Sequence, residues 1–202
     1  MTDFLNCKKV FYEDFELRVH QDVYEPAEDS FALAKHVPAF AKGDVLDMGT
    51  GSGILAVVAS NDKTSVLGVD VNPLAVENAR FNSELNGSGC EFAESDLFTE
   101  LESKFDLIIF NPPYLPTAEG EEVMGHINKA WDGGSSGREV IDRFLADAPE
   151  FLSPTGAILT LASSLSGIKE TVEVLRKKGL KTEVLEEVPI FQEKLAVIIA
   201  KK

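Results

Sequence analysis

The segment Asp44-Val-Leu-Asp-Met-Gly-Thr-Gly-Ser-Gly53 indicates the fold class of this 202-residue chain. A short apolar strand, residues 44–48, leads into a G-x-G-x-G turn and then into a small helix expected at residues 52–60. A glycine-rich turn between a strand and a helix is typical of open α/β sheets, in which ligands bind beyond the carboxyl ends of the strands. We therefore interpret this segment as the first strand and first turn of such a sheet.

Strands and helices continue to alternate downstream of this turn. Apolar runs predict four further strands, at residues 65–70, 90–94, 105–110 and 156–162. The run at 105–110 is the most apolar and is followed by two prolines, so we expect it at the centre of a sheet that is covered on both faces. The helix after residue 70 is expected to start with Asn72 as its cap and Pro73 at its first position, and to end at Gly87. Its residues Leu74, Phe81 and Leu85 share one face.

The last third of the chain completes the pattern. One helical stripe ends near Pro149, and its members are Val140, Ile141, Phe144, Leu145 and Ala148. A second, marked by Ile168, Val172 and Leu175, is closed by Gly179. Two final strands, 181–188 and 195–200, have only a short turn between them, which predicts an antiparallel hairpin at one edge of a parallel, doubly wound α/β sheet.

The segment before this sheet is short. Residues 10–19 mix apolar and polar residues at roughly period two and are expected to form a strand or hairpin, which would leave an exposed edge unless another chain covers it. A helix is expected at residues 31–36, with Ser30 as a possible cap. No linker or repeat divides the chain, so we predict one domain over residues 1–202, with an amino-terminal segment 1–30 and a core 31–202.

The charge and hydropathy of the sequence indicate which kinds of partner the protein binds and in which compartment it is found. Nineteen lysine and arginine residues against 34 acidic ones give a net charge of −15, which argues against a nucleic-acid substrate and would attract a basic protein. The sequence contains neither an apolar stretch of roughly 20 residues nor a recognisable secretory signal, which predicts a cytoplasmic protein without a membrane span. Cys7 and Cys90 show no metal-ligand spacing and are interpreted as thiols, and no metal site is expected.

The glycine turn and three carboxylates predict a nucleoside site. A dinucleotide loop would carry G-x-G-x-x-G, whereas here the third glycine comes one residue early, which disfavours a nicotinamide oxidoreductase. A structural strand-to-helix turn is the alternative. Asp47, Asp70 and Asp96 occur at the ends of three successive strands. A purely structural turn would not require these carboxylates. Asp70 would accept hydrogen bonds from a ribose, and Asp96 from an adenine amino group while Leu97 covers the ring.

Asn111-Pro112-Pro113-Tyr114 follows the fourth expected strand. With this motif the chain resembles the HemK/PrmC methyltransferases, which modify the glutamine of a Gly-Gly-Gln loop in translation release factors; the motif also occurs in amino-directed DNA methyltransferases. The resemblance implies a seven-strand Rossmann-like methyltransferase fold and S-adenosylmethionine as the cofactor. It also implies a glutamine side-chain amide as the methyl acceptor.

The chemistry of this motif can be argued from its residues. An amide nitrogen is a poor nucleophile, because its lone pair is delocalised into the neighbouring π-system. The side-chain oxygen of Asn111 and a main-chain carbonyl of the Asn-Pro-Pro segment would accept both N–H groups and aim the nitrogen at the sulfonium methyl. The prolines restrict φ and remove competing donors, and Tyr114 offers an aromatic face to a flat amide.

Two further segments resemble the short archaeal and eukaryotic branch of HemK-like enzymes. Tyr24-Glu-Pro-Ala-Glu-Asp-Ser30 matches a segment that closes over the cofactor in the family, which implies Ser30 as a cofactor contact. Residues 131–139 match the W-x-G-G-x-x-G-R-E loop, for which a structural role is as plausible as substrate contact. The predicted cofactor-binding residues are Ser30, Asp47, Gly49, Gly51, Asp70, Asp96, Leu97 and Asn111, and the predicted catalytic residues are Asn111, Pro112 and Tyr114.

The chain departs from the bacterial enzymes at its amino terminus, where about 43 residues precede the first sheet strand and leave no room for their helical domain. In the resembling branch, a small zinc-binding activator protein typically binds the methyltransferase, so such a partner is expected beside the release-factor substrate. Three alternatives remain open: a lysine or a nucleic-acid adenine as the acceptor, or a non-catalytic cofactor-binding subunit.

Overall fold

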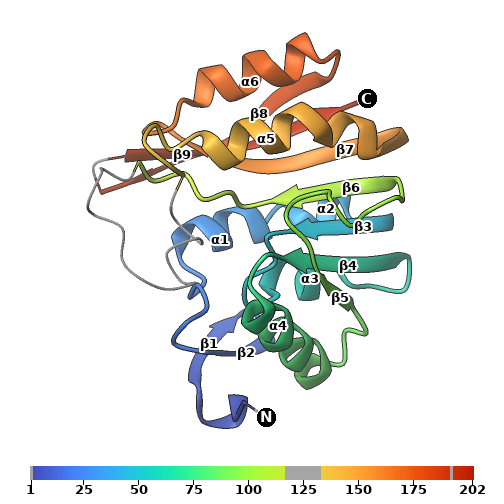
Figure 1. The fold of residues 1–202 in the computed structure, drawn as a ribbon, viewed down its shortest axis with the longest axis vertical. Coiled ribbons are helices and arrows are strands. Elements are labelled where there is room, and N and C mark those ends of the chain that lie inside the picture. The colour runs from blue at the N-terminus through green and yellow to red at the C-terminus, as the bar shows by residue number, and fades with distance from the viewer. Residues whose placement is uncertain (1, 117–132, 192) are drawn as a thin grey trace.

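The computed structural model of the protein describes residues 2–116, 133–191 and 193–202. In these ranges a seven-stranded sheet forms the centre of the fold, and a two-stranded hairpin precedes it in the chain (Figure 1). The strands of the large sheet are β3 (Gly43–Met48), β4 (Thr64–Asp70), β5 (Glu91–Glu94), β6 (Phe105–Phe110), β7 (Leu152–Ser163), β8 (Lys181–Ile190) and β9 (Glu193–Lys201). The expected α/β class is thereby confirmed.

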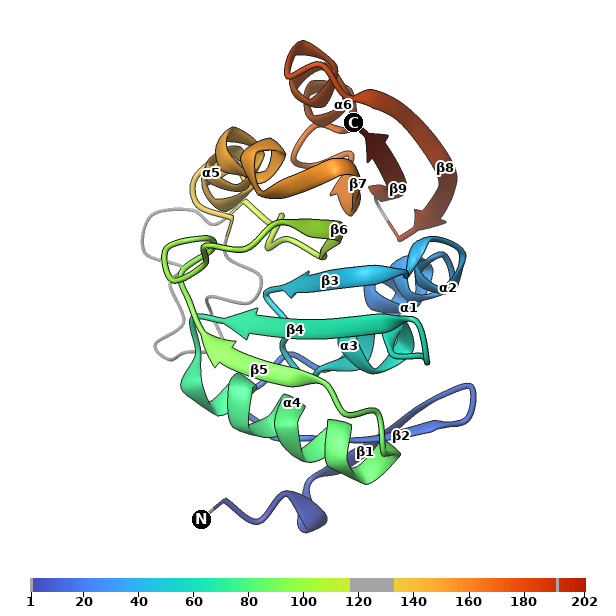
Figure 2. The ribbon, with the colours of Figure 1, turned by 90° about the vertical axis from the view of Figure 1, so that its right-hand side faces the viewer.

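The order of the strands in the large sheet is β5-β4-β3-β6-β7-β9-β8 (Figure 2). The first five strands in this order pair in parallel, and β9 pairs antiparallel with both β7 and β8. The predicted carboxyl-terminal hairpin is therefore present at one edge. The chain runs from β3 outward to β4 and β5 and then returns to β6 on the other side of β3, so the direction of winding reverses between β3 and β6. In open α/β sheets such a reversal opens a crevice at the carboxyl ends of the strands.

Helices cover both faces of this sheet. One apolar cluster joins residues of α1 (Glu28–Ala34), α2 (Val37–Phe40), α3 (Ile54–Ala59) and α4 (Pro73–Asn86) to one face. A second cluster joins α5 (Glu139–Asp147) and α6 (Ile168–Lys177) to the other. In β6, Leu107 and Ile109 belong to the first cluster, whereas Ile108 and Phe110 belong to the second. The most apolar strand is thus central and buried on both sides, as predicted.

Helix α4 starts and ends as the sequence predicts but buries a different face. The side chain of Asn72 accepts a hydrogen bond from the Leu74 amide at 3.0 Å, and Gly87 ends the helix in the left-handed conformation. The face of Leu74, Phe81 and Leu85 is not the buried one, because Leu85 is exposed. The buried positions are small or polar: Ala75, Val76, Asn78, Ala79, Asn82 and Ser83. Small residues allow α4 to approach the glycine turn, and the asparagines serve the amino-terminal hairpin.

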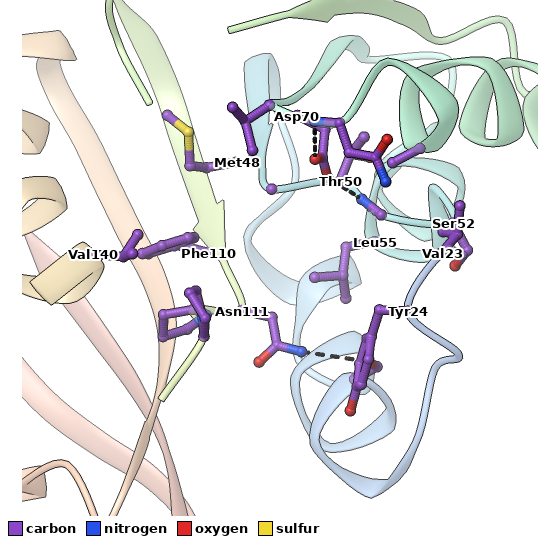
Figure 3. A pocket seen from close by; sticks show the side chains of 18 of the residues that line it. Val23, Tyr24, Met48, Thr50, Ser52, Leu55, Asp70, Phe110, Asn111 and Val140 are labelled. Atoms are coloured by element: carbon purple, nitrogen blue, oxygen red, sulfur yellow. Dashed lines mark hydrogen bonds between the residues drawn. The ribbon is translucent and has the colours of Figure 1, made fainter. Parts of the chain in front are cut away.

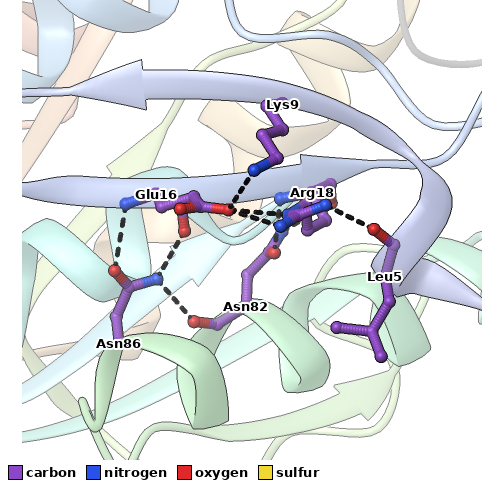
Figure 4. A network of polar contacts seen from close by, with 6 residues as sticks. All are labelled: Leu5, Lys9, Glu16, Arg18, Asn82 and Asn86. Atoms are coloured by element: carbon purple, nitrogen blue, oxygen red, sulfur yellow. Dashed lines mark hydrogen bonds and ion pairs between the residues drawn. The ribbon is translucent and has the colours of Figure 1, made fainter.

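The predicted hairpin consists of β1 (Lys8–Tyr12) and β2 (Phe15–Val19), preceded by the 3-10 helix η1 (Phe4–Asn6). Asparagine side chains of α4 pair with the edge of β2 in place of another strand (Figure 4). The Asn82 amide accepts from the Arg18 N–H at 2.8 Å and donates to the Arg18 carbonyl at 3.0 Å. Asn86 makes the same pair of bonds with Glu16, and Asn78 accepts from the His20 N–H and donates to the Arg18 carbonyl.

The spacing of these asparagines explains why a helix can complete a strand edge. Four residues along an α-helix advance about 6 Å, and two residues along a strand advance about 6.6 Å, so every fourth helix residue meets every second strand residue. The prediction that residues 10–19 leave an exposed edge is therefore wrong for β2, since its outer backbone groups are already paired. Strand β1 pairs with β2 alone in this two-stranded sheet, and its Phe11 side chain has 63% of its surface exposed.

Two connections complete the described fold. Residues 95–104 join β5 to β6 through turns without a helix, so the alternation of strand and helix is interrupted there. The short 3-10 helix η3 (Ala148–Phe151) links α5 to β7 at the predicted proline boundary. Among the described residues, no helix is both long and apolar enough to span a membrane.

Candidate functional site

A cavity of about 350 Å³ opens at the carboxyl ends of the parallel strands, beside the reversal between β3 and β6 (Figure 3). This volume lies within the range of small-molecule and cofactor sites. Nine of the residues predicted from the sequence line the cavity: Ser30, Gly49, Gly51, Asp70, Asp96, Leu97, Asn111, Pro112 and Tyr114. The expected convergence of strand ends therefore brings together residues that lie between positions 30 and 114 of the sequence.

The glycine turn forms the floor between β3 and α3. Gly51 has a φ of +54°, and its N–H donates to the Asp70 carboxylate at 2.9 Å, which ties the turn to the end of β4. Gly53 has a φ of +84°, and a Cβ atom at this position would lie 2.9 Å from the Cβ of Ala79 in α4. Glycine is thus required at residue 53 both for its backbone conformation and for the close approach of α4.

Asp47 departs from its predicted role. Its side chain is completely buried, and it does not line the cavity. Its Oδ2 atom accepts hydrogen bonds from the Thr50 hydroxyl at 2.6 Å and from the Ala56 N–H at 3.1 Å. Asp47 therefore holds the glycine turn against the start of α3 from behind, and the cofactor contact predicted for it is replaced by a contact within the protein.

Burial raises the pKa of Asp47 from 3.8 to about 7, against the opposing effect of the Thr50 and Ala56 hydrogen bonds. Because the folded state then binds this proton more tightly than the unfolded state, the contribution of Asp47 to stability is complete below about pH 4 and is lost as the pH rises towards 7. We compare the free energies of unfolding of the wild type and of Asp47→Asn. We expect the value for the wild type minus the value for the variant to fall by about 2 to 3 kcal/mol between pH 5 and pH 8. Denaturant titrations of both proteins at the two pH values measure this difference, and an unchanged difference would contradict the assignment.

Asp70 is the last residue of β4 and lines the cavity. Its Oδ2 accepts from Gly51 N–H, and its Oδ1 accepts from Asn72 N–H at 2.9 Å. Burial raises the pKa of Asp70, while these backbone N–H groups lower it. The backbone N–H groups of Gly51, Val71 and Asn72 fix the carboxylate, and a remaining lone pair can accept a hydrogen bond from a ligand hydroxyl.

Residues from both halves of the sheet enclose the far end of the cavity. Leu97 lines it and adopts a φ of +52°, an uncommon conformation for a residue other than glycine. The carboxylate of Asp96 is held by the Arg143 guanidinium of α5 at 2.8 Å. Phe110 and Val140 add apolar surface on the side of β6 and α5 (Figure 3). This end can accept a flat, apolar ring with an amino group at its rim.

The opposite end is built around the Asn111 amide. The Asn111 Nδ2 group donates to Asp29 Oδ2 at 3.0 Å and approaches Ser30 Oγ at 3.4 Å. Its Oδ1 is buried and has no hydrogen-bond partner in the described part of the chain. Burial raises the pKa of Tyr114, and the nearby Asp29 carboxylate adds to this effect, so the phenol stays neutral. A buried acceptor without a partner is costly, which points to a donor supplied by a bound molecule.

Several lining residues were not predicted as site residues. Tyr24 and Asp29 line the cavity, but in their segment only Ser30 was predicted as a cofactor contact. Val140 and Arg143 also line it, although their helix was interpreted as part of the core. The helical stripe gave Val140 a packing role, and Arg143 lies outside that stripe. The approach of α5 to the cavity depends on the sheet order, which local sequence does not reveal.

The loop around Trp131 is only partly described, since Trp131 and Asp132 lie outside the described residues. At its other end, Arg138 donates to the Ser166 carbonyl at 2.6 Å and pairs with Asp142 at 2.7 Å. Arg138 therefore joins the start of α5 to the turn after β7. No group of three or more potential metal ligands occurs among the residues that the structure describes.

The sequence of this chain is similar to a known protein family and to characterised relatives. The model of the methyltransferase small domain family matches residues 25–192. A putative protein N5-glutamine methyltransferase of Methanocaldococcus jannaschii is 43% identical over 189 residues, which cover 93% of this chain and 96% of that protein. The methyltransferase HEMK2 of Homo sapiens is 33% identical over 189 residues, with 88% of each chain covered.

A solved structure has the same fold. It is described as the E. cuniculi Mtq2–Trm112 complex, responsible for the methylation of the eRF1 translation termination factor. The similarity has a TM-score of 0.71 and 27% identity, and it covers 90% of this chain and 99% of that chain.

Proposed function

Because the chain belongs to the methyltransferase small domain family, and within it to the HemK-like protein N5-glutamine methyltransferases, we propose that it methylates the glutamine of a Gly-Gly-Gln loop in a translation release factor. The observation that carries this proposal is the buried, unpartnered Oδ1 of Asn111 at the end of a cofactor-sized cavity. A primary amide presents N–H groups to such an acceptor.

S-adenosylmethionine supplies an electrophilic methyl group on a positively charged sulfur. The chain's own residues fit its parts: Asp70 would accept hydrogen bonds from the ribose hydroxyls, and Asp96 and Leu97 would hold the adenine beside Phe110. Ser30, Gly49 and Gly51 also line the cavity and would contact the amino-acid portion and the ribose. Val23, Tyr24 and Ser30 line the cavity, which supports the proposal that the amino-terminal segment covers the bound cofactor.

Asn111 and its neighbours orient the acceptor nitrogen. The Asn111 Oδ1 and a main-chain carbonyl of the Asn-Pro-Pro segment accept the two N–H groups of the glutamine amide, and this pairing is strongest when positive charge develops on the nitrogen. Pro112 offers no N–H donor that could compete for these acceptors. Tyr114 remains a neutral aromatic surface against which the planar amide packs.

Methyl transfer to matched substrates tests this proposal. We expect labelled methyl to pass from S-adenosylmethionine to a release-factor domain that carries Gly-Gly-Gln and not to the same domain with this glutamine replaced by alanine. Equal labelling of both domains would refute the glutamine assignment. Two competing acceptors are tested in parallel: a domain with lysine at the same position and an adenine-containing DNA duplex. If either is labelled faster than the Gly-Gly-Gln domain, the preferred substrate is a lysine or an adenine and not glutamine.

We further propose that a small partner protein, of the zinc-binding activator type, assembles with this chain. The support is the solved relative, which is a complex of Mtq2 with Trm112. The hairpin β1–β2 adds less support than the sequence suggested, since α4 already pairs with the edge of β2. We expect the isolated chain to show low activity or self-association in light scattering and methylation assays. A monomer with full activity on free release factor would remove the reason for proposing a partner.

A further inference from the structure

The carboxylate of Asp29 is a buried charged group to which the proposed mechanism gives no role. Asp29 lies in the first turn of α1, and only 5% of its surface is exposed. It accepts hydrogen bonds from four groups on three residues. Its Oδ1 receives the Ser30 N–H at 2.6 Å and the Ser30 hydroxyl at 3.2 Å, and its Oδ2 receives the Tyr24 hydroxyl at 2.9 Å and the Asn111 amide at 3.0 Å.

The bond to Asn111 determines which end of that amide faces Asp29. An ionised carboxylate can only accept hydrogen bonds, so it pairs with the NH₂ group of Asn111 and repels its oxygen. The Ser30 hydroxyl lies on the same side of the NH₂ group, at 3.4 Å. With the nitrogen held there, Oδ1 is the atom of this amide that has no hydrogen-bond partner among the described residues.

We propose that Asp29 is a positioning residue for methyl transfer: it holds the Asn111 amide with its oxygen available to the substrate nitrogen. This inference rests on the proposed function, in which Asn111 Oδ1 accepts an N–H of the acceptor amide. The Tyr24 hydroxyl, which binds the same Asp29 oxygen, keeps the carboxylate in place. If the Asn111 amide turned over, its NH₂ group would face the N–H groups of the substrate, and donor would meet donor.

Asp29→Asn tests this proposal with almost no change of shape. The new amide carries its own NH₂ group, which can donate to Asn111 Oδ1 and so stabilise the reversed orientation. We expect kcat to fall roughly ten- to a hundredfold, while the Kd of S-adenosylmethionine and the melting temperature stay close to those of the wild type. The matched control is Glu28→Gln, which removes the same charge from the neighbouring, exposed position outside the cavity and should retain wild-type kcat.

The orientation of the Asn111 amide can be measured independently of any methyl acceptor. In a ¹⁵N–¹H spectrum, the side-chain NH₂ pair of Asn111 is identified by its loss in Asn111→Ala. We expect slow solvent exchange of this pair in the wild type and in Glu28→Gln, and fast exchange with a changed chemical shift in Asp29→Asn. This readout still holds if the wild type fails to methylate glutamine, so failure of the proposed function and failure of this inference are distinguishable.

Two outcomes would overturn the positioning role. One is an unchanged Asn111 NH₂ pair in Asp29→Asn, because the amide would then be oriented without the carboxylate. The other is a loss of S-adenosylmethionine affinity as large as the loss of kcat, because Asp29 would then act as a cofactor ligand. A fall in kcat with a changed NH₂ pair and retained cofactor affinity would support the proposal.

Discussion

Asn111→Ala is expected to lower kcat by roughly a hundredfold or more while the fold and most of the affinity for S-adenosylmethionine are retained. The substitution removes the only unpartnered acceptor that the described chain presents at this end of the cavity. Asp29 keeps its bonds from Tyr24 and Ser30, so the local structure should survive. Single-turnover assays at saturating cofactor, together with calorimetry of cofactor binding, separate the two effects.

The matched control for this substitution is Asn6→Ala, which truncates an exposed asparagine whose side chain donates a hydrogen bond to Asp3. We expect wild-type turnover from it. Near-normal turnover by Asn111→Ala would exclude the orienting role of the Asn111 oxygen.

Asp70→Ala is expected to weaken binding of S-adenosylmethionine by about 1.5 to 3 kcal/mol, or roughly ten- to 150-fold in Kd, because hydrogen bonds to a charged acceptor are lost. The same change frees the Gly51 N–H, so part of the effect could arise from the turn. Asp70→Asn keeps one oxygen for that N–H and should show an intermediate loss. Calorimetry on these variants, with exposed Asp62→Ala as the control, measures the series. Wild-type affinity in Asp70→Ala would contradict the ribose assignment.

The sheet and the position of the site could be predicted because they depend on local signals. Apolar runs separated by helical stripes indicated the strands, and parallel strands place their carboxyl ends at one edge. Ligand-facing side chains were harder to identify. In β3, side chains alternate between the two faces of the sheet, so Asp47 packs on the side of α3 while its neighbour Met48 lines the cavity.

Contacts between distant segments could not be predicted from local patterns. The local sequence of α4 does not indicate a role for its buried asparagines. That role becomes clear only in the tertiary structure, where Asn82 contacts Arg18 of β2, 64 residues earlier in the chain. Asp29 was visible as part of a motif, but its partner Asn111 lies 82 residues later. Both cases depend on tertiary structure that brings a polar side chain to a specific backbone or amide group.

The most direct test of the central claim is the location of the transferred methyl group. The protein, with any required partner, is incubated with S-adenosylmethionine and a release-factor domain, and the digested product is sequenced by tandem mass spectrometry. The account predicts one methyl group on the side-chain nitrogen of the glutamine in Gly-Gly-Gln. A methyl group on a lysine, or on any other residue with that glutamine unmodified, would contradict it.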